Sequence, residues 1–261
     1  MIALIKELVQ GFKALFPGGR FRYVLIILAM IGSAISISEL LVLKFFVNIV
    51  VREEQIPRDE FILLGTGLVI FFVLTRVGQY AQRTYRVKAF ARSFKALKKL
   101  ENRGAKNQEW AMAFELSSLL TNATQLVAIL LFFLVIHPSF ALLNALVLGI
   151  VLTLISRLYM QHVEVQQQLL TENNGKQAKP QRRYAERIKA AESGGLVSAG
   201  GMIVLLGSLL YLSYNQDISI SNTLIIFFGV RLQNASLTNS SRSLMRYAKA
   251  KAGVVERAED E

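Results

Sequence analysis

The sequence predicts an all-α membrane protein with six transmembrane helices and two cytoplasmic helical hairpins. Hydrophobic residues make up 53% of the 261 residues, and they occur in long blocks. An α-helix needs about 20 mostly apolar residues to cross the hydrocarbon core of a bilayer. The formal net charge is +12, and the basic residues lie between the apolar blocks. This distribution favours contact with a membrane surface and argues against a nucleic acid partner.

The chain divides into three predicted parts. Residues 1–19 are amphipathic, lack the short apolar core and cleavage site of a secretory signal, and end at Pro17-Gly18-Gly19. We expect them to form a helix lying in the membrane interface. Residues 20–250 are expected to form the six-helix domain, and residues 251–261 a cytoplasmic C-terminal tail.

Six apolar blocks supply the predicted spans. In order they are Phe21–Val50, a block from near Glu60 past Tyr80, about Leu116–Ile136, Phe140–Met160, about Gly194–Tyr214, and a block from near Ile220 to about Arg246. The third and fourth blocks are separated only by "HPS". Because His137-Pro138 is a typical turn sequence, we expect two helices joined by a tight turn there.

The distribution of Lys and Arg predicts that both termini are cytoplasmic. Residues Arg83–Glu109, after the second block, contain nine Lys or Arg, and Arg157–Glu192, after the fourth, contain seven. "HPS" and "NQDIS" contain none, whereas both termini are basic. Basic loops stay in the cytoplasm, so an even number of spans fits, and we expect a bacterial inner membrane protein.

The two basic loops are predicted to be helical. "YRVKAFARSFKALKKLENRG" has apolar residues at helical spacing, and "RRYAERIKAAESG" follows Pro180. Folded as paired arms, each loop would extend about 20–25 Å from the membrane at 1.5 Å per residue. The alternative is a surface helix lying on lipid headgroups.

Two stretches resemble the transmembrane domain of an ABC exporter. "HPSFALLNALVLGIVL" resembles the Pro-marked turn from the third span into the fourth, and Ile218–Asp260 resembles the sixth span with its "ER" ending. The resemblance implies a homo- or heterodimer that exports a hydrophobic or amphiphilic substrate, with ATP and Mg bound by a separate ATPase subunit. The basic hairpins would contact that ATPase through Lys98, Lys99, Arg103, Lys176 and Lys179. Both hairpins are short for the family.

The chain itself carries no recognisable catalytic motif. It has no G-x-x-x-x-G-K-[ST] phosphate loop, no cysteine, and two widely separated histidines. We expect no enzyme activity, cofactor or metal site in this chain. Besides a separate ATPase subunit, two alternatives stay open: an ion-driven transporter or non-transporting membrane scaffold, or a chain that is one part of a longer protein.

Polar residues inside the spans predict a substrate cavity. Ionisable groups at mid-bilayer are costly and usually functional. The predicted cavity residues are Glu39, Arg76, Asn122, Gln125, Arg231, Asn234 and Thr238. Their charge would make the cavity mildly positive and favour anionic or amphiphilic substrates. The alternative is that these groups satisfy one another inside the bundle, for instance as a Glu39–Arg76 or Glu39–Arg231 pair.

Overall fold

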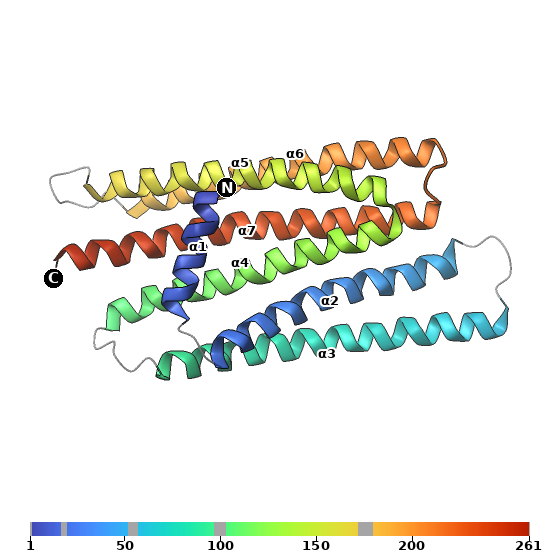
Figure 1. Ribbon diagram of the computed structural model, residues 1–261, viewed down its shortest axis with the longest axis horizontal. Helices are drawn as coiled ribbons and strands as arrows, with labels where there is room; N and C mark the ends of the chain where they lie inside the picture. The colour runs from blue at the N-terminus through green and yellow to red at the C-terminus, as the bar shows by residue number, and fades with distance from the viewer. Residues whose placement is uncertain (1, 17–19, 52–56, 97–102, 172–179, 261) are drawn as a thin grey trace.

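The computed structural model describes residues 2–16, 20–51, 57–96, 103–171 and 180–260, and the regular structure in these ranges is helical. Its helices are α1 (Ile2–Leu15), α2 (Arg20–Val50), α3 (Arg58–Ala96), α4 (Arg103–Ile136), α5 (Pro138–Thr171), α6 (Pro180–Tyr214) and α7 (Ile220–Asp260). Helices α2 to α7 run along one bundle, and α1 lies across it (Figure 1). We call the end with the C-terminus proximal and the opposite end distal.

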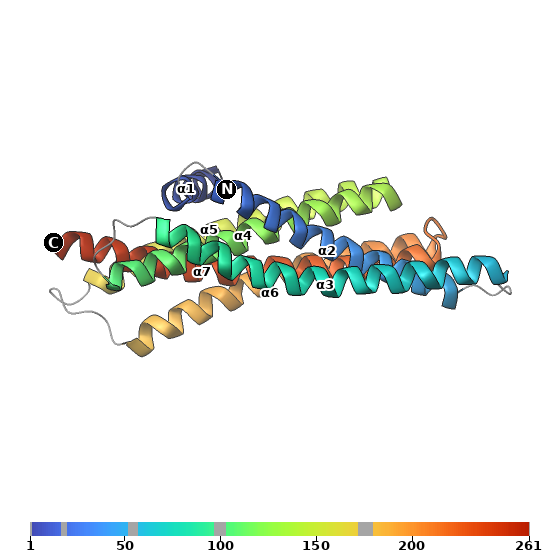
Figure 2. The ribbon, with the colours of Figure 1, turned by 90° about the horizontal axis from the view of Figure 1, so that it is seen from below.

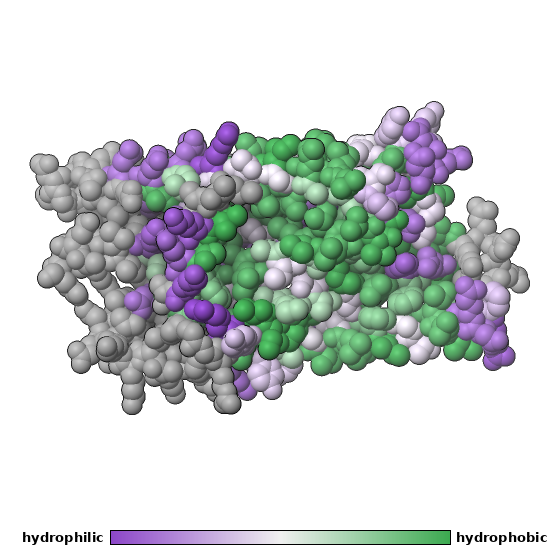
Figure 3. Space-filling view, viewed as in Figure 1, coloured by the Kyte–Doolittle hydropathy of each residue, from purple (hydrophilic) through white to green (hydrophobic). Residues whose placement is uncertain are grey.

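Within the described residues, five helices are long and apolar enough to span a membrane. The qualifying segments are Arg22–Val50, Arg58–Gln82, Glu109–Ile136, Pro138–Gln166 and Ala185–Tyr214. In the space-filling view, apolar side chains cover the middle of the visible face of the bundle, with hydrophilic residues towards its ends (Figure 3). The chain is therefore an all-α integral membrane protein whose apolar helices contact the bilayer.

The sixth predicted span forms a helix that does not qualify by composition. α7 runs along the bundle with the other long helices (Figure 1), and it packs against α2, α4, α5 and α6. Several of its polar side chains are buried in these contacts: Gln233, Ser236, Ser240, Ser241 and Ser243. A helix that faces mainly protein has little need of apolar side chains, which explains why its composition differs from that of the five apolar segments.

The turn between α4 and α5 lies where the sequence predicts it. α4 ends at Ile136 and α5 begins at Pro138, a position that suits Pro because the first helical N–H has no partner inside the helix. The backbone N–H of Phe140 donates to Nδ1 of His137 over 3.1 Å, which caps the new helix. Phe133 and Phe140 then meet edge to face across the turn, and both are fully buried.

The arms of the two proximal hairpins are unbroken helical continuations of the spans. α3 runs unbroken to Ala96, well beyond Gln82 at the end of its apolar segment. α5 likewise continues to Thr171, and α6 begins at Pro180, before its apolar segment. The helices continue beyond their apolar segments as the predicted arms require, and separate surface helices are absent from the described parts of these arms. Within the described residues α5 packs against α6, whereas α3 packs chiefly against α2 and hardly touches α4, so the predicted pairing of the first hairpin's arms is not observed.

The predicted N-terminal helix forms and is fastened to α5 and to α7. Figure 2 shows α1 lying to one side of the bundle. The Glu7 carboxylate accepts a hydrogen bond from the Tyr159 hydroxyl over 2.8 Å and forms an ion pair with Lys251 Nζ over 2.6 Å. Glu7 therefore ties α1 to α5 and to α7. Its location in a membrane interface stays a prediction.

Candidate functional site

Glu39 and Arg76 are joined through a glutamine between α2 and α3. Gln79 Nε2 donates to Glu39 Oε1 over 2.7 Å, and Arg76 donates to Gln79 Oε1 over 3.2 Å. The Arg76 guanidinium also lies 5.2 Å from the centre of the Phe72 ring, a favourable cation–π arrangement. The direct Glu39–Arg76 ion pair considered from the sequence is not formed between these described residues, which are linked instead through the amide of Gln79.

Asn122 and Gln125 help to hold α4 against α7. Ser236 of α7 donates to the backbone oxygen of Asn122 over 3.3 Å and lies 3.5 Å from Gln125 Oε1. Asn122 Nδ2 is buried with no hydrogen-bond partner among the described residues. This cluster faces the contact between two helices, and one of its amide donors is left unused.

Asn234 and Thr238 face α6. Ser198 donates to Asn234 Oδ1 over 2.6 Å, and Thr238 lies opposite Gly195. One turn further on, Gly194 lies so close to Ser241 that an added Cβ would collide with the serine side chain. Small residues therefore let α6 and α7 approach closely, as is typical of helix pairs in membranes.

Sequence reasoning missed the most deeply buried polar pair. Asn144 of α5 and Gln233 of α7 exchange two hydrogen bonds between their side-chain amides, of 2.9 and 2.8 Å. Their exposed fractions are 0% and 2%. The available signal was Asn144 within the apolar start of α5 and the adjacent amides Gln233 and Asn234 in α7, because a buried amide must find a partner. The identity of that partner could not be read from one sequence.

Arg231 lies apart from these clusters, on an exposed face of α7. The exposed residues on this face recur every three or four positions: Phe228, Arg231, Ala235, Asn239, Arg242 and Arg246. Towards the proximal end, Arg242 pairs with Glu192 of α6 over 3.1 Å and Arg246 with Glu115 of α4 over 3.5 Å. We call the six exposed residues from Phe228 to Arg246 the α7 polar face. Exposed side chains on the neighbouring helices are mainly apolar, such as Ile27 on α2 and Ile203 on α6.

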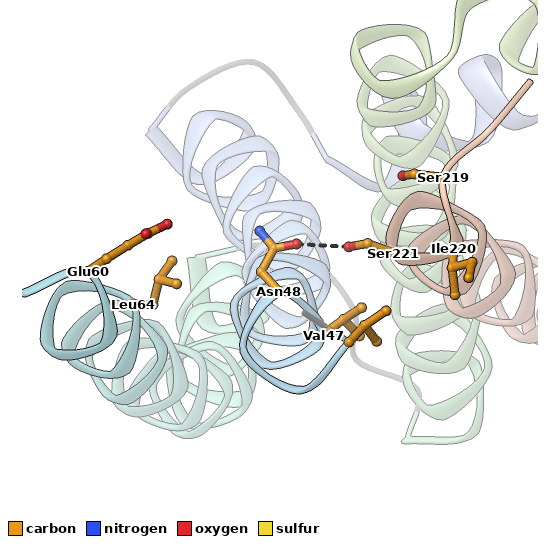
Figure 4. A pocket seen from close by; sticks show the side chains of 8 residues that line it. Val47, Asn48, Glu60, Leu64, Ser219, Ile220 and Ser221 are labelled. Carbon is orange, nitrogen blue, oxygen red and sulfur yellow. Dashed lines mark hydrogen bonds between the residues drawn. The ribbon is translucent and has the colours of Figure 1, made fainter. Parts of the chain in front are cut away.

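A cavity of about 390 Å³ opens at the distal end, where α2, α3 and α7 converge. Asn48 of α2 and Ser221 of α7 border it, and Ser221 donates to Asn48 Oδ1 over 2.8 Å (Figure 4). Glu60 and Leu64 of α3 lie on its other side. The Asn48–Ser221 hydrogen bond fastens the distal end of α2 to the start of α7.

The predicted ATPase-contact residues are largely outside the described part of the chain. Lys98, Lys99, Lys176 and Lys179 fall in residues 97–102 and 172–179, which the structure does not describe. Arg103 is the first residue of α4. The proposed contact surface therefore stays a prediction. In the described ranges, no three His, Asp or Glu residues gather as metal ligands would.

Comparison of the chain with protein-family models and with curated proteins finds no match. A family assignment is therefore a proposal that depends on the topology and on the polar residues described above.

Proposed function

We propose that this chain is the membrane subunit of an ABC-exporter-like transporter for a hydrophobic or amphiphilic substrate, with ATP and Mg bound by a separate chain. The α7 polar face is the observation that carries the proposal. It includes Arg231, Asn239 and Arg242, and α7 runs along the bundle beside helices whose exposed residues are apolar.

A polar strip of this kind is poorly suited to lipid. A charged side chain at the centre of a bilayer costs about 2.5–3.5 kcal/mol on insertion scales, so such groups normally face a protein or a water-filled path. In the proposed arrangement, α7 is the sixth span and both termini lie in the cytoplasm of a bacterial inner membrane. Two subunits, identical or different, would enclose a path between their α7 polar faces. Arg231 would favour anionic or amphiphilic substrates there.

A second candidate is a membrane scaffold that transports nothing. The local pairing of the predicted cavity residues favours it, because Glu39 is bonded to Gln79 and Asn234 to Ser198. In such a protein the α7 polar face would be covered permanently by a partner protein. Both candidates require that lipid does not cover this face, but they differ in whether water reaches it.

Cysteine labelling tests whether water reaches the α7 polar face. The chain has no cysteine, so a substituted cysteine gives a unique signal. Ala235 is exposed on the α7 polar face, and Val204 is exposed on α6. With a membrane-impermeant maleimide on membranes open to both sides, we expect Ala235→Cys to be labelled and the control Val204→Cys to be protected by lipid. Protection of both positions would contradict a transport path.

Purification in mild detergent separates the transporter from the scaffold. A transporter should retain an ATPase subunit whose ATP hydrolysis responds to Arg231→Ala. Arg157→Ala is a suitable control, because Arg157 is exposed on α5 and lies off the α7 polar face. Retention of an unrelated membrane protein, together with complex activity unchanged by Arg231→Ala, would favour the scaffold.

A further inference from the structure

An apolar groove lies between α1 and the proximal halves of α2 and α4. Its volume is about 450 Å³, within the range of about 300–1,000 Å³ typical of small-molecule sites. Its walls include Leu8 and Phe12 of α1, Ile26 of α2, and Leu120 and Ala123 of α4. The groove is therefore a hydrophobic slot whose open side lies among membrane-facing helices.

Two cations, Lys13 and Arg22, also line this groove. Arg22 is held in place: its guanidinium donates to the backbone oxygen of Phe16 over 2.6 and 3.2 Å and lies 5.9 Å from the centre of the Phe12 ring. Lys13 is exposed in the last turn of α1. The groove thus combines apolar walls with positive charge contributed by both helices of the α1–α2 corner.

We propose that this groove binds an anionic phospholipid, with one acyl chain against the apolar walls and the phosphate beside Lys13 and Arg22. The walls require an apolar occupant and the cations require an anion, so the matching ligand is an amphiphile with a negative headgroup. Such lipids surround any helix that contacts the bilayer, and basic residues beside a membrane attract them. A free phosphate would satisfy the cations but leave the apolar walls uncovered.

The bound lipid would fasten α1 to the bilayer. α1 is held on the bundle by Glu7 and by Leu4, Leu8 and Leu15, which pack against the main core. Arg22 bonds to Phe16 at the corner, and the groove lies where α1 faces α2 and α4. A chain seated there would bury the exposed side chains of Ile5 and Val9. This proposal depends on membrane insertion alone, so it can hold or fail independently of the transport proposal.

Native mass spectrometry of the full chain in mild detergent tests the site, with phosphatidylglycerol as the probe and phosphatidylcholine for comparison. Lys13→Gln should weaken phosphatidylglycerol binding about fivefold, the effect of one Lys at an anionic lipid surface. The matched control is Lys6→Gln, which removes the same charge from another exposed position of α1 outside the groove. It should leave binding close to that of the unchanged protein.

A second variant tests the apolar part of the site. Ala123 is exposed and lines the groove, so Ala123→Phe should fill it and reduce binding of both lipids while the melting temperature stays near that of the unchanged protein. Equal losses in Lys13→Gln and Lys6→Gln would show general charge attraction and overturn the proposal. It would also fail if inorganic phosphate displaced phosphatidylglycerol, or if Ala123→Phe had no effect on binding.

Discussion

α3 and α7 are the two longest helices described, with 39 and 41 residues, and of the two only α3 contains a segment apolar enough to span a membrane. α3 contains an apolar span, yet it packs chiefly against α2, and most of its large apolar side chains are exposed. α7 fails the same compositional criterion, yet it packs against four other helices and buries polar residues. The composition of each helix follows what surrounds it.

The difference has a simple physical origin. On α3, exposed side chains such as Ile70 and Val73 pack against no other part of the described bundle, and a bilayer around them favours apolar residues. On α7, the hydroxyls and amides face other helices, where hydrogen bonds compensate for their removal from water. Hydropathy therefore identifies helices that contact lipid, and it underestimates a helix that lies among them.

The largest expected contrast comes from placing a charge on each helix. Ile70 lies at the middle of the apolar segment of α3, and Ala235 lies on the α7 polar face. Ile70→Lys should raise the apparent free energy of membrane insertion by about 2.5–3.5 kcal/mol, whereas Ala235→Lys should have little effect. A glycosylation-based insertion assay measures both. Equal penalties would show that lipid covers α7 as it covers α3.

Glycine substitutions should show how tightly α7 is enclosed. A Cβ added at Gly229 of α7 would lie 2.5 Å from the Phe133 ring of α4. Over-packing of this kind typically costs about 1–3 kcal/mol, so Gly229→Leu should lower the melting temperature in detergent. Gly207 of α6 has no neighbouring atom within 4 Å of an added Cβ, and Gly207→Leu should be tolerated. An unchanged melting temperature for Gly229→Leu would mean that α7 is loosely packed against α4.

The smallest expected effect concerns the amide pair between α5 and α7. Gln233→Leu leaves Asn144 buried without its partner and should destabilise the protein by about 1 kcal/mol, within the range measured for hydrogen bonds between membrane helices. Asn144→Leu should behave alike. Because the double variant leaves no unpaired amide, it should recover most of the loss. Strictly additive losses in a thermal-melting cycle would mean that the two amides are not coupled.

The sequence predicts the helices well because apolar length and turn residues are local signals. The turn at His137-Pro138 is confirmed, and α2 begins at Arg20, one residue before the predicted start at Phe21. α4 begins at Arg103, well before the predicted Leu116, because a proximal arm need not be apolar. Hydropathy alone cannot place such an arm within its helix.

The candidate site was less predictable, because small rotations decide what a side chain contacts. The sequence analysis assigns Arg231 and Asn234 to one predicted cavity, but residues three apart differ by about 60° around a helix. That angle places Asn234 against Ser198 while Arg231 stays exposed. Asn144 and Gln233 are 89 residues apart in the sequence. Their pairing depends on the register between α5 and α7, which a single sequence does not reveal.

The contact between Glu7 and Lys251 also constrains the order of assembly. The two residues are 244 positions apart, so α1 leaves the ribosome long before its partner residue in α7 has been synthesised. Until then α1 must wait at the bundle surface with its carboxylate bonded to Tyr159 or to water. The N-terminal helix therefore reaches its final attachment only after α7 is in place.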